Sequence, residues 1–169
     1  MKRLLIVLCL MTMSVLTVAP AAHASVTLTK PERTLLALIN HARAKRSLHR
    51  LRMVTTLERA SRAHSREMLR RGYFGHNSYN GESVGARLIR FGYKTSGCTS
   101  WTVGECIAYG RGTYGSPKRV FAAWMKSPAH RVIILTKAFR NAGIGRAKGT
   151  YRGTSGTIFF TLDCGRRIK

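Results

Sequence analysis

Acidic residues are scarce in this sequence, which has six Asp and Glu against thirty Lys and Arg in 169 residues. With so few acids the basic residues cannot be neutralised within the chain, and a field of this kind draws polyanions. The basic residues are spread along the chain and lack the interleaved aromatics of a nucleic-acid-binding module. We therefore predict affinity for anionic cell-envelope polymers or lipid surfaces, without specific nucleic-acid recognition. The alternative is that these residues form solvated faces that keep the protein soluble.

Long apolar runs are also few, and only the N-terminal one is of notable length. Lys2 and Arg3 precede an apolar run over residues 4–18, and an A-x-A cleavage pattern ends at Ala24. The run is shorter than the roughly 20 residues that span a bilayer, which favours a signal peptide over a membrane anchor. We predict a secreted, extracellular protein cleaved after Ala24. Loss of Lys2 and Arg3 lowers the formal charge from +24 to +22.

Cysteine pairs with Cys-x-x-Cys spacing are missing, which argues against a zinc-finger type of structural site. Three cysteines follow the signal peptide: Cys98, Cys106 and Cys164. In an exported protein this number is typical of one disulfide and one free thiol. Spacing alone leaves all three pairings open.

No repeat, low-complexity tract or linker divides residues 25–169, so we expect one domain of the α+β class. Capping signals and apolar spacing predict helices in the first two thirds and strands in the last third. The expected helices are 30–46, 55–72, a short one ending at Gly92, one opening at Ser116-Pro117 and one opening at Ser127-Pro128. The expected strands are 101–109, 142–147 and 157–163, forming a small antiparallel sheet.

A metalloprotease motif of the H-E-x-x-H type is absent, so no single segment supplies catalysis. Glu105 stands in an apolar run, where an unpartnered carboxylate would cost several kcal/mol, and therefore calls for partners. His76 and His130 lie near helix boundaries among small residues, where loops commonly present functional groups. Two imidazoles and one carboxylate can hold a divalent metal ion such as zinc with positions left open. The three residues are our candidate cluster.

Other candidates have simpler interpretations. His64 falls on an apolar helix face and is interpreted as a hydrogen-bonded core histidine. Asp163 ends an apolar strand and is a weaker candidate than Glu105. Ser83 lies in a G-x-S-x-G pattern, but the polar segment before it is not the buried strand that a nucleophile elbow requires.

Several motifs occur in a family-like order along residues 32–165. They are G-Y-F-G-H-N-S at 72–78, G-E-C-I-A at 104–108 and A-W-M-K-S-P-A-H at 123–130, with A-H-S around His64 and T-L-D-C-G from Thr161. Together they resemble the bacterial branch of the CAP family, the cysteine-rich secretory, antigen 5 and pathogenesis-related 1 proteins. The resemblance implies an α-β-α sandwich with a small antiparallel sheet flanked by helices, and secretion.

The resemblance also implies a central cleft that in some relatives holds zinc or another divalent ion. By motif, His76, Glu105 and His130 correspond to cleft residues and tentative metal ligands, with His64, Ser78 and Asp163 in support. A second cleft glutamate found in many eukaryotic relatives is absent after Trp124.

Two positions where the family usually has asparagine and an aromatic residue are Cys106 and Cys164 in this chain. Because these positions are expected in strands of one small sheet, the departure suggests a Cys106–Cys164 cross-strand disulfide. The other two pairings stay possible.

Together these features favour a non-enzymatic binding module with a His/Glu cleft for a small ligand or divalent ion. Its basic surface would hold it on anionic cell-envelope polymers or lipids. The alternative is a metal-assisted hydrolase acting on an extracellular or cell-wall substrate, with Glu105 as metal ligand or base. Sequence alone leaves open whether the protein is an enzyme.

Overall fold

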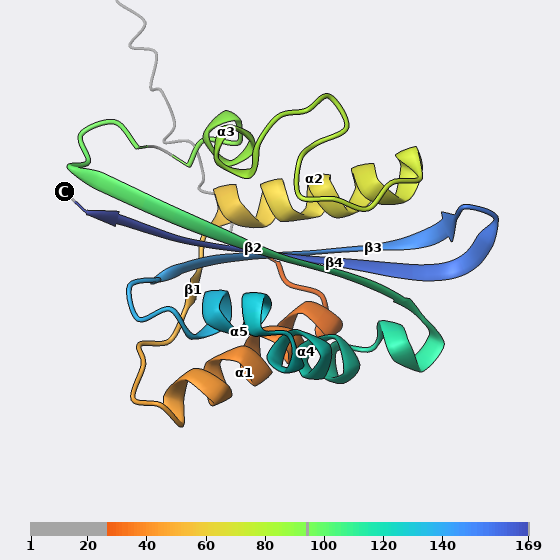
Figure 1. Ribbon diagram of the computed structural model, residues 1–169, viewed down its shortest axis with the longest axis horizontal. Coiled ribbons are helices and arrows are strands. Elements are labelled where there is room, and N and C mark those ends of the chain that lie inside the picture. Colours follow the sequence, from red (N-terminus) through yellow and green to blue (C-terminus); the bar gives the residue numbers. More distant parts are fainter. Residues whose placement is uncertain (1–26, 94, 169) are drawn as a thin grey trace, which may run out of the picture.

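Helices cover both faces of a sheet in the computed structural model, which describes residues 27–93 and 95–168 (Figure 1). One layer contains α1 (Lys30–Ala44), α4 (Pro117–Lys126) and α5 (Pro128–Leu135), and the other contains α2 (Thr55–Arg71) and α3 (Val84–Arg90). This arrangement confirms the predicted α-β-α sandwich. The predicted signal peptide, residues 1–24, lies outside the described residues. Within them, no helix combines the length and apolar character needed to cross a membrane.

The sheet has four strands in the order β1-β3-β4-β2. β3 and β4 form an antiparallel hairpin, and β2 pairs antiparallel with β4 along its whole length. The antiparallel prediction is confirmed for these three strands. β1 instead pairs parallel with β3 and escaped prediction because two residues are too few to show an alternating pattern. The bounds are β1 (Arg52–Met53), β2 (Ser100–Arg111), β3 (Asn141–Tyr151) and β4 (Thr154–Ile168), with a 3₁₀ turn at Gly112–Gly115.

The sheet face toward α1, α4 and α5 carries the main apolar core. Side chains alternate between the two faces of a strand, so Cys106 enters this core while its neighbour Glu105 points to the other face. Trp124 of α4 is buried here, and its indole N–H donates to the Ile107 carbonyl at 3.1 Å. The core contains Leu35 and Ile39 of α1, Trp124, Ile134 of α5, Ile144 of β3, and Phe160, Leu162 and Cys164 of β4.

The opposite sheet face is smooth enough for α2 to lie directly on β3. A Cβ atom at Gly143 would fall 2.1 Å from the Leu57 carbonyl carbon, and one at Gly145 would fall 2.1 Å from Arg62 N. Only glycine permits this approach. As a result the polar residues of α2 reach the sheet, and the Ser65 hydroxyl lies 2.8 Å from the Thr161 hydroxyl.

Two T-x-x-E patterns in the sequence, Thr29–Glu32 and Thr55–Glu58, each predict a capping box, and the structure forms the first but not the second. At the start of α1, Glu32 accepts a hydrogen bond from the Thr29 backbone N–H at 2.7 Å. The similar pattern at Thr55 forms no capping box, because α2 begins at that residue with Val54 as its N-cap. Glu58 instead pairs with Arg62 one turn later.

The predicted Cys106–Cys164 disulfide is not formed in the structure, where both thiols are free, as is that of Cys98. In the sheet register Cys164 faces Gly104, and Cys106 faces Leu162. Such a diagonal pair has Cα atoms about 7–8 Å apart, beyond the about 4.4–6.8 Å that a disulfide spans. Burial raises the pKa of the Cys164 thiol to about 12 and that of Cys106 further still, which leaves both thiols protonated in the core.

Candidate functional site

A buried carboxylate on the edge strand β2 is the centre of the candidate site. The Glu105 side chain is only 1% exposed. Its Oε2 accepts a hydrogen bond from Arg87 Nη2 at 2.5 Å, and its Oε1 lies 2.8 Å from His76 Nδ1. The structure therefore brings two predicted site residues together and adds a guanidinium that offsets the burial of the carboxylate.

Arg87 of α3 also fixes the loop that carries His76. Its Nη1 donates to the His76 carbonyl and to Ser78 Oγ, each at 3.0 Å. Ser78 was expected in a supporting position, whereas no motif singled out Arg87. The signal that could have found its place is helical spacing, because Arg87 stands three residues after Val84 and four before Phe91, on the apolar face of the short helix. A basic residue on an inward face needs a buried acidic partner.

His64 of α2 is fully buried beneath this loop. Its Nε2 lies 2.9 Å from the Gly75 carbonyl, and a carbonyl only accepts, so Nε2 carries the proton and donates. The same His64 Nε2 lies 3.8 Å from Glu105 Oε2. Burial lowers the pKa of His64, which keeps the ring neutral near pH 7. These contacts fit the interpretation of His64 as a hydrogen-bonded core histidine.

Asp163 faces Glu105 across the β2–β4 register and is fully buried. Ser61 Oγ lies 2.6 Å from Asp163 Oδ2 and 2.9 Å from the Leu57 carbonyl, yet its single hydrogen can serve only one of them. A protonated Asp163 satisfies both contacts. Burial above all, and then the charge of Glu105, raises the pKa of Asp163 well above its ordinary value. Asp163 is therefore a neutral acid beside an Arg87–Glu105 ion pair.

Asp163→Asn is expected to stabilise the protein at neutral pH. Between the unfolded pKa of about 3.9 and the raised folded pKa, only the native state holds the proton, so wild-type stability falls by about 1.4 kcal/mol per pH unit. The amide of the Asn variant does not titrate, so the variant does not lose stability in this way as the pH rises. Thermal unfolding should give equal melting temperatures near pH 4 and a higher one for the variant at pH 7.

Glu82→Gln is the matched control, because the hydrogen bond from Arg90 lowers the pKa of Glu82. A lowered carboxyl pKa contributes stability above the unfolded pKa and loses it as pH falls. This variant should therefore match wild type in acid and be slightly less stable at pH 7. Asp163 cannot be a neutral acid if its Asn variant follows the same trend as the control.

His130 of α5 approaches the site from the other side of β2. It is half-buried, and its ring centroid lies 6.4 Å from that of Trp124. Burial, and then the charge of His76, lowers the pKa of His130. Among the described residues His130 makes no hydrogen bond or ion pair with Glu105, unlike His76.

The predicted metal set of His76, Glu105 and His130 stays a prediction. In the described part of the chain, no group of three or more His, Cys, Asp or Glu side chains is arranged to hold a metal ion. Both oxygens of Glu105 already accept hydrogen bonds, and one of the donors is the cationic Arg87. In this arrangement the donor set does not fit a divalent ion.

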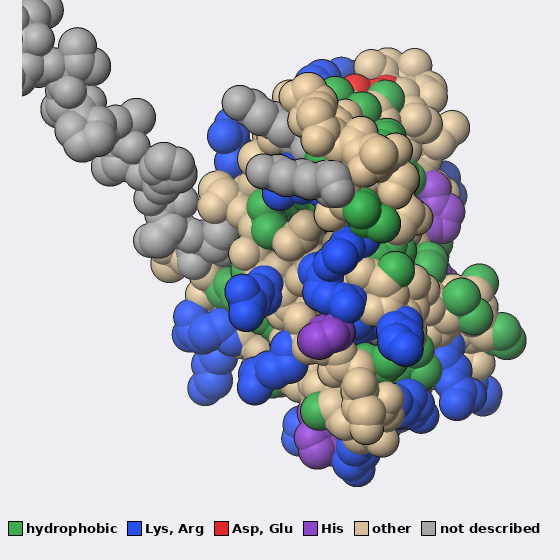
Figure 2. All heavy atoms as spheres, turned by 90° about the vertical axis from the view of Figure 1, so that its left-hand side faces the viewer, with side chains coloured by type: hydrophobic (Ala, Val, Ile, Leu, Met, Phe, Trp, Pro, Cys, Tyr) green, Lys and Arg blue, Asp and Glu red, His purple; other side chains and the backbone are tan. Residues whose placement is uncertain are grey.

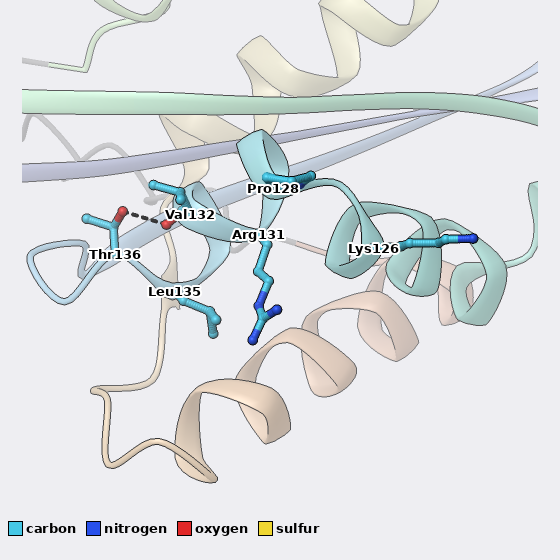
Figure 3. Close-up of a pocket in the computed structure, with 6 residues that line it drawn as sticks. All are labelled: Lys126, Pro128, Arg131, Val132, Leu135 and Thr136. Carbon is cyan, nitrogen blue, oxygen red and sulfur yellow. Dashed lines mark hydrogen bonds between the residues drawn. The ribbon is translucent and has the colours of Figure 1, made fainter.

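Two hollows lie on opposite layers of the sandwich. One of about 530 Å³ opens above the 53% exposed His76, so a small ligand could reach this ring without reaching Glu105. The other, of about 470 Å³ and mainly apolar, lies along α5 (Figure 3). The first is lined by Tyr73, Gly75, His76, Asn77, Ser78 and Tyr79, and the second by Lys126, Pro128, Arg131, Val132, Leu135 and Thr136.

The fold and the site define a class: three-layer α-β-α proteins with a histidine and a buried glutamate meeting at an edge strand. The chain belongs to the CAP family, because the model of the cysteine-rich secretory protein family matches residues 36–164. This confirms the resemblance seen in the motifs.

Relatives agree with this assignment. An uncharacterised Bacillus subtilis protein, YkwD, is 36% identical over 116 residues, which is 68% of this chain but 41% of that protein. The chain thus spans less than half the length of this curated relative. An outer surface protein of Borrelia burgdorferi has a TM-score of 0.68 at 21% identity, covering 84% of this chain and 96% of that one. An extracellular Bacillus anthracis protein with an SCP domain has a TM-score of 0.66 at 23% identity, covering 84% and 45%. These two likenesses show the fold.

Proposed function

We propose that the protein is a secreted, non-enzymatic binding module that docks on anionic cell-envelope polymers through a basic surface. The cleft beside His76 would take a small ligand. The observation that carries this proposal is the unequal distribution of charge between the two helical layers.

The layer of α1, α4 and α5, together with β1, is strongly basic, and the one acidic residue of these four elements, Glu32 in the first turn of α1, is paired with Arg62 of α2. Residues 33–57 contain six Lys and Arg, residues 117–140 contain six more, and neither segment contains Asp or Glu. Figure 2 shows blue side chains gathered over the lower part of one end of the molecule, with red atoms only at its upper edge. Since this layer lies low in Figure 1 as well, the basic surface belongs to it.

The acidic side chains are engaged by arginines of the layer of α2 and α3. Glu32 binds Arg62 of α2 at 2.8 Å, and Glu82 binds Arg90 of α3 at 2.8 Å. Glu105 is paired with Arg87. Since these ion pairs all use arginines of α2 and α3, the cations of the opposite layer are left to attract an external polyanion.

The site itself favours binding over hydrolysis. A hydrolase of the kind considered above would need Glu105 as metal ligand or general base. Glu105 is instead enclosed, with Arg87 on one oxygen and His76 on the other. The solvent-facing group is His76, which can contact a ligand as a hydrogen-bond donor. Its pKa is raised, chiefly by the hydrogen bond to Glu105, which favours the charged ring.

Sedimentation with insoluble cell-wall polymer and with anionic vesicles tests this proposal. We expect the protein to pellet with both at about 25 mM salt and to be released at about 1 M, where the Debye length falls to about 3 Å. Vesicles of phosphatidylcholine are the neutral control. The surface role is wrong if no anionic material retains the protein at low salt, and release of polymer fragments would favour the hydrolase.

A further inference from the structure

A basic groove of about 770 Å³ lies between α1, the strand β1 and the connection from α5 to β3. The groove shares no lining residue with the His76 hollow, which lies in the loop between α2 and α3. The groove is lined by Leu36, Asn40, His49, Arg50, Leu51, Arg52, Arg140 and Asn141.

Strand geometry directs the arginines into this groove. Leu51 is buried in the core, and side chains alternate along an extended segment, so Arg50 and Arg52 point together to the outside. Parallel pairing sets Arg52 beside Asn141, and the Arg52 N–H donates to the Arg140 carbonyl at 2.8 Å. Three guanidinium groups from two chain segments therefore share one concave surface.

Arg140 is held in position by its own loop. Its Nη1 donates to the carbonyls of Lys137 at 2.5 Å, Phe139 at 3.0 Å and Ala138 at 3.1 Å. These bonds use one nitrogen of the guanidinium group and leave the others for a ligand. A guanidinium fork of this kind matches the geometry of a phosphate group.

No carboxylate neutralises these cations. None of the residues that line the groove is Asp or Glu, and Glu32 of α1 is paired with Arg62. The ion pairs in the described residues do not include Arg50, Arg52 or Arg140. A concave wall of one charge sign also concentrates its field more than a flat surface does. The groove is thus a site for a ligand with several negative charges.

The shape of the groove favours a polymer strand over a membrane. A flexible polymer chain can enter a concave groove. A lipid bilayer presents a broad surface, and the arginines inside the groove cannot all reach it. Membrane-binding surfaces also place large apolar side chains among the charges. The exposed large hydrophobic residues of the described chain include Phe74, Tyr114 and Val132, and none of them lines this groove.

We propose that the groove binds a strand of a phosphodiester-linked polymer, with Arg50, Arg52 and Arg140 on its phosphates. This inference rests on the proposed docking to anionic envelope material and names the site and the chemical class of ligand. The neighbouring His49 also lines the groove and adds a fourth hydrogen-bonding side chain.

A double variant tests the groove against its matched control. Arg50→Gln with Arg52→Gln removes two groove charges, and Arg111→Gln with Lys148→Gln removes two exposed charges near the other end of the sheet. The probe is poly(glycerol phosphate) of about twenty units, titrated calorimetrically at low salt. We expect about a tenfold loss of affinity for the groove variant and less than about a twofold loss for the control. Circular dichroism checks that both variants are folded.

The outcomes separate the two proposals. If wild type binds neither this polymer nor anionic vesicles, the proposed docking function fails. If wild type binds the polymer and both double variants lose affinity equally, docking stands and the groove is overturned. Should the groove variant lose affinity for phosphatidylglycerol vesicles but keep it for the polymer, the occupant is a membrane and the proposal is wrong.

Discussion

Replacing Arg87 by methionine will destabilise the protein by about 3–5 kcal/mol at pH 7, as expected when one partner of a buried ion pair is removed. The side chains of Arg87 and Glu105 are each 1% exposed, so solvent cannot replace the lost guanidinium. The variant also loses the hydrogen bonds that hold the His76 carbonyl and Ser78. Urea unfolding measures the difference directly.

Arg90→Met is the matched control, one turn further along α3. Arg90 also pairs with a glutamate, Glu82, but its side chain is 57% exposed, so the loss should stay below about 1 kcal/mol. Adding Glu105→Leu to Arg87→Met should recover most of the stability, because an apolar pair leaves no buried charge unpaired. Equal losses for Arg87→Met and Arg90→Met would refute the buried pair.

Arg43→Met will lower the free energy of unfolding by about 3 kcal/mol or more, the second large effect. Each buried carbonyl group that is left without a hydrogen-bond donor costs about 1–3 kcal/mol of stability. Arg43 is fully buried and donates to four carbonyls from three segments. Nε donates to His49 at 2.8 Å, Nη1 to Ile134 at 2.7 Å and Thr136 at 3.1 Å, and Nη2 to Phe139 at 3.2 Å. The guanidinium thereby caps α5 and holds both walls of the basic groove.

Two further substitutions make the Arg43 prediction specific. Arg43→Lys keeps the charge but cannot reach carbonyls in several directions, so it should recover only a minor part of the loss. The Arg46 side chain is exposed and makes one hydrogen bond, to the Ala42 carbonyl, so Arg46→Met should change the stability little. If the lysine variant is as stable as wild type, then the positive charge, and not the set of hydrogen bonds made by the guanidinium, accounts for the contribution of Arg43 to stability. Hydrogen exchange should also quicken in residues 45–51 of the Met variant.

Much of the fold could be predicted because its signals are local. Apolar spacing and helix-start signals placed the five helices, and apolar segments between turns placed the central parts of the three long strands, which extend further at their ends than predicted. The residue pattern at Thr55 equals that at Thr29, yet only the latter forms a capping box, because α2 begins at Thr55 itself and has Val54 as its N-cap. A two-residue strand such as β1 has no periodicity to detect.

The candidate site was less accessible from sequence. An apolar run containing Glu105 indicated a buried carboxylate that needs partners, and motifs pointed to His76. Which cation meets the carboxylate depends on how α3 packs against β2, a tertiary fact that no local pattern carries. Arg87 is one of many basic residues, so its type gave no warning. The disulfide prediction failed for a related reason, since it depends on a strand register shifted by two residues.

The distribution of carboxylates has a further consequence for how the molecule would sit on its support. All the acidic residues except Glu32, which is paired with Arg62, lie in α2, in the loop before α3 or on the strand face toward α2, so the protein has a dipole moment across the sandwich. A polyanion would orient this dipole before contact. The layer of α1 and β1 would face the wall, and the loop between α2 and α3 would face the medium (Figure 1). A protein attached in this way displays the His76 hollow outward to diffusing ligands, so that anchorage and capture do not compete for the same surface.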